Sequence, residues 1–194
     1  MPLLLETLSL PDIIVIQVPK HCDERGFLSE TYNKREFGNA GIDLEFVQEN
    51  HTMSRQKSTV RGLHFQTPPF AQDKLVRVAR GVIFDVAVDI RAGSPNFGEH
   101  VSAIISADAW NQILIPKGFA HGFVTLEPDT EVIYKVSEFY SPEHDRGLFW
   151  YDPTLGINWP ISEAQAVVSD KDRRQPVLNE LPAYFCYQPK DQPS

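Results

Sequence analysis

Residues Leu75–Gly98 read LVRVARGVIFDVAVDIRAGSPNFG and contain the strongest fold signal in the chain. Two runs rich in β-branched residues, Leu75–Arg80 and Val82–Ile90, are separated by the single glycine Gly81. β-branched residues favour strands, and glycine accepts the backbone conformations that a tight turn requires. Glycine, serine, proline and asparagine then gather within a few residues, which is typical of a loop. We therefore predict two consecutive strands joined by a tight turn, with a longer loop after the second strand.

The same succession of apolar runs and turn residues continues along the chain. No long amphipathic helix pattern interrupts it, and we expect only short helical turns at Asn33–Phe37 and Ser162–Ala166. Many short strands separated by turns predict an all-β sandwich or barrel. The further predicted strands are Ile13–Val18, Leu44–Gln48, Val101–Ser106, Ile113–Pro116 and Val132–Phe139.

Composition limits the function classes. The chain has 194 residues, which suits one domain with its own hydrophobic core. Its 18 Lys+Arg and 26 Asp+Glu give 18 − 26 = −8, which argues against a nucleic-acid partner. No apolar run is long enough to predict a membrane span or a membrane partner. The cysteines, Cys22 and Cys186, are too few for a disulfide framework and fit reduced thiols in the cytoplasm.

One segment opposes the net charge. Between Arg55 and Arg80 there are six basic residues and one acidic residue, so the segment carries 6 − 1 = +5. A solvated basic surface explains such a cluster in most proteins. The segment also contains the block RGLHFQ at Arg61–Gln66, in which histidine and glutamine accompany the arginine. Charge alone leaves a basic surface and an anion-binding pocket equally open.

Two of the six histidines have a context that indicates chemistry. His121 ends the pattern Pro116-x-Gly118-x-x-His121, which resembles a cupin turn, where the chain bends before a strand that points the histidine into a barrel. Metal-binding cupins pair this turn with a His-x-His strand, whereas the matching block here reads His64-Phe65-Gln66. Two histidines and an amide make a poor metal site, which favours an acid–base role for His64. We expect surface or packing roles for His21, His100 and His144.

Tyr134 and Tyr140 lie six residues apart in the stretch Val132–Tyr140, which contains the predicted strand Val132–Phe139. Because side chains alternate along a strand, both would share one face. If that face points inward, two phenols enter one cavity. Two ordinary core or rim aromatics are the alternative, and spacing alone favours that alternative.

Ordered blocks over almost the whole chain resemble the dTDP-4-dehydrorhamnose 3,5-epimerase family. The resemblance rests on Asp23–Phe27, Gln48–Asn50, Arg61–Gln66, Ala71–Val76, Asp85–Arg91, Ser94–Gly98, Ile115–Phe123, Phe139–Pro142, Ile157–Pro160 and Ser169–Asp172. It implies a cupin-type jelly roll, a double-stranded β-helix with short peripheral helices. It also implies a homodimer that works without metal or cofactor on a small-molecule nucleotide sugar.

The same resemblance implies roles for individual residues. His64 resembles the general base, Asp172 its carboxylate partner, Lys74 the cation beside the keto oxygen, and Tyr134 the acid on the opposite face. Tyr140 resembles the residue that stacks on thymine. The further expected substrate-binding residues are Arg25, Glu30, Gln48, Glu49, Asn50, Arg61, His121, Asp145 and Lys171.

These residue types suit proton abstraction next to a ketone. Such a hydrogen is weakly acidic, so its removal needs a positioned base and stabilisation of the developing enolate. Histidine can act as the base near neutral pH, and a cation such as Lys74 stabilises the negative charge of the enolate. The implied reaction inverts carbons 3 and 5 of dTDP-4-keto-6-deoxy-D-glucose to give dTDP-4-keto-L-rhamnose, the precursor of dTDP-L-rhamnose.

Arg61 presents a geometric difficulty. Strand alternation puts Arg61 on the opposite face from His64, so the two share a site only through a bulge near Gly62 or through a partner subunit. We favour the partner subunit. The +5 segment is then interpreted as the region that attracts the diphosphate of the substrate.

Three acidic residues depart from the family pattern. Asp73 stands where glycine is common, and we expect little effect on Lys74 because adjacent side chains point to opposite faces. Asp145 stands where glutamate is often found, and Asp170 is a second acid near Asp172 that competes for the role of dyad partner.

Residues 1–194 are expected to form one domain. We predict N-terminal strands at a dimer interface over residues 1–45, a barrel core over 46–150 and a wrapping segment over 151–194. The alternative activities are epimerisation of carbon 3 or carbon 5 alone, a metal-dependent cupin oxygenase, and a sugar-nucleotide binder without catalysis.

Overall fold

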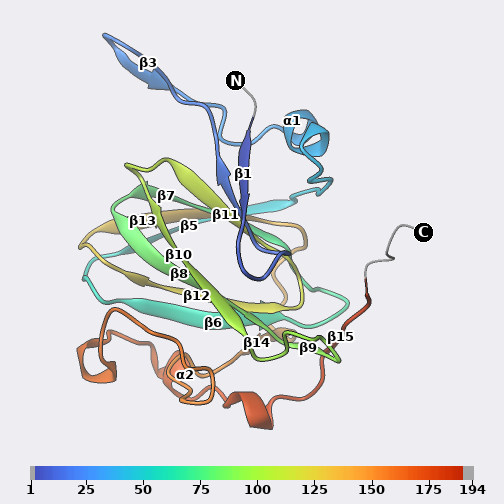
Figure 1. Ribbon diagram of the computed structural model, residues 1–194. Helices are drawn as coiled ribbons and strands as arrows, with labels where there is room; N and C mark the ends of the chain where they lie inside the picture. The colour runs from blue at the N-terminus through green and yellow to red at the C-terminus, as the bar shows by residue number, and fades with distance from the viewer. Residues whose placement is uncertain (1–2, 190–194) are drawn as a thin grey trace.

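Two antiparallel sheets face each other in the computed structural model, which describes residues 3–189 (Figure 1). In spatial order the six-stranded sheet contains β1 (Leu4–Thr7), β2 (Ile14–Gln17), β11 (Asn111–Ile115), β7 (Lys74–Arg80), β13 (Thr130–Val136) and β5 (Gln48–Ser54). The five-stranded sheet contains β10 (His100–Ser106), β8 (Val82–Asp89), β12 (Phe119–Thr125), β6 (Val60–Gln66) and β14 (Asp145–Gly147). The all-β prediction is confirmed.

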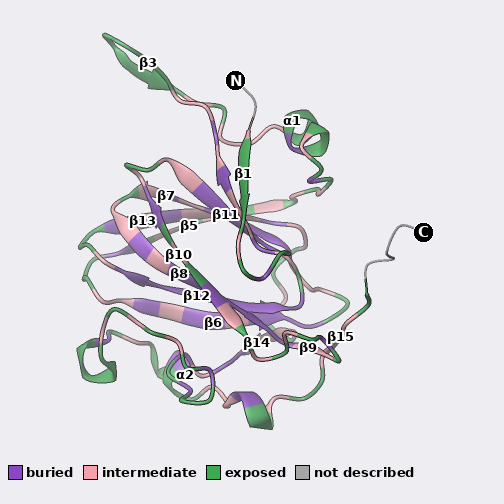
Figure 2. Ribbon diagram, in the orientation of Figure 1, coloured by how far each residue is buried: buried purple, intermediate pink, exposed green. Residues whose placement is uncertain are grey.

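Short elements surround this barrel. The hairpin of β3 (His21–Asp23) and β4 (Gly26–Leu28) projects away from it as a thin arm (Figure 1). Its strands are exposed, in contrast to central strands such as β8 and β12, which are largely buried (Figure 2). The remaining elements are α1 (Lys34–Asn39), β9 (Arg91–Ala92), the 3₁₀ helices η1 (Glu163–Gln165) and η2 (Leu178–Glu180), α2 (Asp170–Arg173), and β15 (Phe185–Cys186), which pairs with β9.

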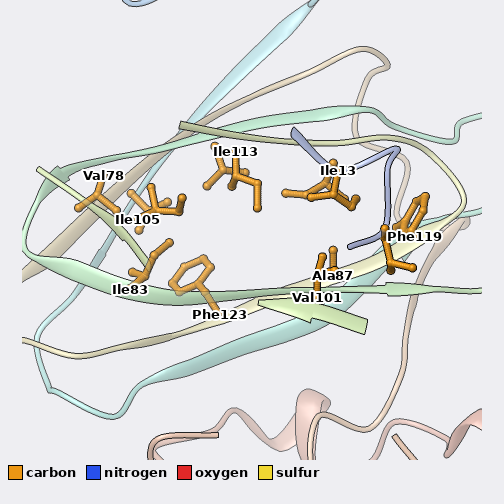
Figure 3. Close-up of a cluster of buried hydrophobic side chains, with 13 residues drawn as sticks. Ile13, Val78, Ile83, Ala87, Val101, Ile105, Ile113, Phe119 and Phe123 are labelled. Atoms are coloured by element: carbon orange, nitrogen blue, oxygen red, sulfur yellow. The ribbon is translucent and has the colours of Figure 1, made fainter. Parts of the chain in front are cut away.

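The central core fills one part of the space between the sheets. Ile13, Ile105, Ile113 and Phe123 belong to this cluster of buried side chains, which Figure 3 shows between the two walls. Burial of such apolar surface is the main stabilising contribution to the fold. Ile13 precedes β2, which pairs with β11, so part of the expected segment 1–45 completes the six-stranded sheet.

The chain ends cover the outer faces of the two sheets. Phe37 of α1 packs with Leu75 and Leu114 on the six-stranded sheet. Trp150 and Leu155 of the C-terminal segment pack with Val86 and other residues of the five-stranded sheet. No helix within residues 3–189 has the length and apolar character needed to cross a membrane.

Two strand predictions are wrong in their bounds. The predicted strand Leu44–Gln48 is wrong, because residues 44–47 lie before β5 and are not in a strand. The apolar side chains of Leu44 and Phe46 pack against the cluster around Phe37 instead. β13 ends at Val136, so Tyr140 lies outside the strand that carries Tyr134. The predicted short helices are present as α1 and as η1.

Candidate active site

Two adjoining cavities lie between the walls of the barrel. Their volumes are about 510 and 350 Å³, and both are lined by His64, Lys74, Tyr134 and Lys171. These four residues therefore mark the place where the two cavities join into one cleft. His64 belongs to the five-stranded sheet, whereas Lys74 and Tyr134 belong to the six-stranded sheet, so the cleft has functional groups on opposite walls.

The shortest contact of His64 in the cleft joins it to Asp172. The imidazole Nε2 lies 2.6 Å from Asp172 Oδ1, although the residues are 108 positions apart. Burial alone would raise the pKa of Asp172, but hydrogen bonds from His64, the Gly62 N–H and the Ser169 hydroxyl hold it below its ordinary value. Asp172 therefore stays ionised beside the imidazole. Of the two acids that sequence left in competition, the structure places Asp172 on His64.

Lys74 is a buried cation at the start of β7. Its Nζ donates a hydrogen bond to the His64 carbonyl oxygen at 3.1 Å. Burial lowers the pKa of Lys74 to about 8, against the opposing effect of the negative charges of Asp145 and Asp85. The neighbouring Asp73 accepts hydrogen bonds from the Lys117 N–H and the Ser137 hydroxyl, so its carboxylate is directed elsewhere.

The two tyrosines line the second cavity from different segments. Burial raises the pKa of Tyr134, and the charge of Arg61 opposes this rise, so its phenol is protonated at neutral pH. Tyr140 is 55% exposed, and its backbone N–H donates to Gln48 Oε1 at 3.0 Å. Its hydroxyl donates to Asp145 Oδ2 at 3.1 Å. Tyr140 thus presents a ring at the rim, whereas Tyr134 lies deeper.

Arg61 shares the cleft with His64 in the same chain, which corrects the expectation that it acts in a partner's site. On β12, His121 pairs with His64 and Phe123 with Arg61. Two steps along β12 therefore face three steps along β6, which is a bulge that turns Arg61 and His64 to one side. Gly62, with φ of +119°, forms this bulge, and a Cβ there would lie 2.7 Å from Gly122 Cα.

A second histidine–carboxylate pair lies beside the first cavity. His121 Nε2 is 2.8 Å from Asp85 Oδ2, and both side chains are buried. Asp85 Oδ1 has no hydrogen-bond partner among residues 3–189. His121 lines the cavity, so the hydrogen bond to Asp85 holds a ring that forms part of the cavity wall.

Several of the expected substrate-binding residues lie at the second cavity, whereas Glu49 does not. Gln48, Asn50, Asp145 and Lys171 line it, and Lys171 Nζ lies 2.5 Å from Asp145 Oδ2. Glu49 follows the alternation of β5 to the other face and pairs with Lys135. The structure therefore does not bring Glu49 to the cleft of its own chain.

Arg25 and Glu30 also lie away from the cleft. Arg25 is at the tip of the β3–β4 arm, where it pairs with Asp23 at 2.6 Å. Glu30 accepts a hydrogen bond from Asn33 and lines a separate cavity of about 650 Å³ beside α1. Figure 1 places this arm and α2 at opposite ends of the molecule.

The amino-acid sequence matches a known protein family over most of its length. Residues 7–180 match the family model described as dTDP-4-dehydrorhamnose 3,5-epimerase. A curated dTDP-4-dehydrorhamnose 3,5-epimerase from Sinorhizobium fredii is 50% identical over 182 residues, which cover 94% of this chain and 93% of the relative. The chain belongs to the dTDP-4-dehydrorhamnose 3,5-epimerase family.

Solved structures give the same family and its cupin-type jelly roll. The crystal structure of a dTDP-6-deoxy-D-glucose-3,5-epimerase from Legionella pneumophila in complex with dTDP-4-keto-L-rhamnose has a TM-score of 0.91 at 40% identity, covering 96% of this chain and 99% of that one. ChmJ, a 3'-monoepimerase from Streptomyces bikiniensis in complex with dTDP-quinovose, has a TM-score of 0.83 at 30% identity, covering 90% and 87%. The solved structures that share this fold therefore include both a 3,5-epimerase and a 3'-monoepimerase.

The donor atoms around the epimerase cleft fit an organic acid–base site better than a metal site. Gln66, the third ligand that a cupin metal site would use, donates to the carbonyl oxygens of Phe70 and Phe139 and accepts from the Ser141 N–H. Within residues 3–189, no group of three or more His, Cys, Asp or Glu side chains is placed to hold a metal ion.

Several cleft residues of this epimerase were not identified from sequence. Thr52 lines the first cavity and lies on the same face of β5 as Gln48 and Asn50, so alternation along that strand was a usable signal. Ser169 also lines the first cavity. The others are Thr59, Val60, Gln72, Phe123, Val167 and Val168.

Proposed function

We propose that this epimerase inverts carbons 3 and 5 of dTDP-4-keto-6-deoxy-D-glucose and releases dTDP-4-keto-L-rhamnose. The observation that carries the proposal is the His64–Asp172 pair on one wall of the cleft, opposite Lys74 and Tyr134 on the other. The Legionella relative, whose structure is a complex with dTDP-4-keto-L-rhamnose, supports the same choice of product.

His64 is the base in this proposal. Asp172 accepts a hydrogen bond from Nε2 and stabilises the imidazolium that forms when the ring takes a proton from the carbon next to the ketone. The other ring nitrogen then acts on the substrate. A positioned acid–base group of this kind contributes about 10²–10⁴-fold to the rate.

Lys74 and Tyr134 complete the inversion. The ammonium of Lys74 stabilises the oxygen of the enolate, and its burial strengthens that interaction because water is excluded. Tyr134 then donates its phenolic proton to the opposite face of the carbon. The keto group at carbon 4 acidifies both neighbouring carbons, so the same two groups serve both inversions once His64 has released its proton to water and Tyr134 has regained one from water.

The cationic side chains suit the diphosphate. Arg61 and Lys171 line the cleft of a chain whose net charge is −8. A guanidinium binds phosphate oxygens with paired hydrogen bonds, and Tyr140 offers a ring on which thymine stacks at the rim. No step of this mechanism is assigned to a metal or cofactor.

A homodimer is part of the proposal. The β3–β4 arm carries Arg25 away from its own cleft, and Phe27 and Leu28 on it are exposed. Contacts within the chain fix the base of the arm, since Lys20 Nζ lies 4.3 Å from the Phe27 ring and 4.2 Å from the Trp110 ring. An arm held in this way suits contact with a second copy, where Arg25 and Glu30 reach the partner's cleft.

The free thiols of Cys22 and Cys186 suit a reducing cytoplasm.

Solvent exchange tests the function. The protein is incubated with dTDP-4-keto-6-deoxy-D-glucose in D₂O, and the sugar protons are followed by NMR. We expect deuterium at carbons 3 and 5 in the L-configured product. His64→Asn keeps the shape of the site without the base, so it should bind substrate and exchange neither carbon.

The similarity to ChmJ makes a single-carbon epimerase the second candidate. Deuterium at only carbon 3 or only carbon 5 would establish that candidate instead. A sugar-nucleotide binder without catalysis predicts no exchange in the unsubstituted protein. A metal-dependent oxygenase predicts a reaction that consumes oxygen and stops in chelator.

A further inference from the structure

The carboxylate of the dyad is carried by a segment that is joined to β6 from outside the sheet. Thr59 and Val167 form a parallel bridge. The Val60 N–H donates to the Val167 carbonyl at 2.9 Å, and the Val167 N–H donates to the Ser58 carbonyl at 2.9 Å. Figure 1 shows α2 beside β6 at the end of this segment. The bridge brings the segment near His64 but does not by itself aim the Asp172 side chain.

The chain changes from extended to helical at Ser169. This residue has φ of −67° and ψ of 154°, and the one-turn helix α2 follows it. Such a short helix is not stable alone, because nucleation fixes several residues for very few hydrogen bonds. α2 therefore depends on contacts at its ends. At its C-terminal end, Arg174 Nε donates to the Asp170 carbonyl at 2.9 Å.

At its N-terminal end α2 is capped by the side chain of Ser169, whose Oγ accepts a hydrogen bond from the Asp172 N–H at 3.1 Å. The capped N–H thus belongs to the residue whose carboxylate contacts His64. From this position the carboxylate reaches His64 Nε2 at 2.6 Å and the Gly62 N–H at 3.4 Å. The Ser169 hydroxyl is also among the groups that lower the pKa of Asp172.

We propose that Ser169 is a positioning residue for the dyad: its hydroxyl fixes the turn of α2 so that the Asp172 carboxylate faces His64. The inference rests on the proposed role of His64 as base. It assigns Ser169 no contact with the reacting carbons, although the residue lines the first cavity. A misdirected carboxylate slows proton abstraction and leaves most substrate contacts in place.

Steady-state kinetics on the full chain separate positioning from binding. For Ser169→Ala we expect kcat to fall about tenfold with KM within about twofold, because small misplacements of catalytic groups reduce rates strongly. Ser169→Thr keeps a hydroxyl cap and should restore kcat. Ser162→Ala is the matched control, since Ser162 starts η1 in the same C-terminal segment and its hydroxyl contacts Gln165, away from the cleft. It should leave kcat and KM unchanged.

Proton NMR of the free protein tests the same inference without substrate. The short His64–Asp172 hydrogen bond should give a low-field imidazole resonance, which His64→Asn identifies by its loss. In Ser169→Ala this resonance should move upfield or broaden. The resonance of the His121–Asp85 pair is an internal control and should stay in place.

Three results would overturn the inference. These are an unchanged His64 resonance with unchanged kcat in Ser169→Ala, a rise in KM in place of a fall in kcat, and an equal loss in Ser162→Ala. If the unsubstituted protein has no epimerase activity, the proposed function fails. The resonance comparison still decides whether Ser169 positions Asp172.

Discussion

Lys74 holds a positive charge where water does not solvate it. Burial lowers its pKa to about 8, while Asp145 and Asp85 act in the opposite direction. Below this value the side chain is an ammonium, the form that stabilises the enolate oxygen in the proposed mechanism. Above it the amine is neutral and the stabilisation is lost. Tyr134 does not titrate in the same range, because burial raises its pKa above the ordinary value of 10.0.

The pH dependence of kcat/KM follows from this balance. We expect the basic limb of the unsubstituted enzyme near pH 8, since kcat/KM reports ionisations of the free enzyme. Asp85→Asn removes a negative charge that raises the Lys74 pKa, so the limb should move to lower pH. Glu131→Gln is the control, because Glu131 pairs with His51 outside the cleft. A basic limb that stays in place in Asp85→Asn would refute this account of Lys74.

At the scale of the element, the bulge in β6 decides which side chains meet. Without it Arg61 would face away from His64. The bulge requires close approach of two backbones, because a Cβ on Gly122 would lie 2.7 Å from the Arg61 carbonyl oxygen and 2.9 Å from Leu63 Cδ2. The close pairing of β6 with β12 therefore requires a glycine on each strand, Gly62 and Gly122.

Gly122→Ala should disturb both stability and the site. The added methyl has to push β6 away, and overpacking of this kind costs about 1–3 kcal/mol in the free energy of unfolding. We expect that loss in urea unfolding, together with a higher KM as Arg61 moves. Gly38→Ala in α1 is the control, since a methyl group at this position would meet no neighbouring atom of residues 3–189 within 4 Å and alanine suits a helix. If Gly122→Ala were as stable as the unsubstituted chain, β6 and β12 would be able to move apart without a cost in the free energy of unfolding.

Sequence predicted the strands whose burial follows a local pattern and missed features set by distant contacts. β7 and β8 were predicted because their runs of β-branched and other apolar residues contain no glycine or proline. Leu44–Val47 was misassigned as strand because apolar residues that pack on the outside of a sheet look the same as strand residues. Local spacing also cannot reveal that Asp172 meets His64 across 108 positions. Family resemblance supplied that pair, and it gave no sign that Glu49 faces away.

For the whole molecule, the placement of charge matters more than its sum. The chain is acidic at −8, yet Arg61, Lys74 and Lys171 all line the cleft. Such local positive potential attracts an anionic nucleotide sugar and weakens as salt screens it. The arm adds Arg25 to this cationic set only if it reaches a second copy.

Mixing two defective chains tests the proposed arm exchange. Arg25→Ala has an intact dyad and a defective arm, whereas His64→Asn has an intact arm and no base. If arms act across a dimer, subunit exchange in an equal mixture should make about one quarter of the sites active, because half of the dimers are hybrid with one complete site each. Each variant alone, refolded in the same way, is the control. No recovery in a mixture that sediments as a dimer would mean that the arm does not serve the partner.

The wide separation of His64 and Asp172 along the chain has a consequence for biosynthesis. A ribosome that has reached residue 150 has already made every strand of both large sheets, because β14 ends at Gly147. A chain made only to this point contains His64 without the carboxylate that contacts it, since Asp172 has not been made. The His64–Asp172 pair is therefore completed only after residue 172 has been made, later than every strand that forms the walls of the cleft.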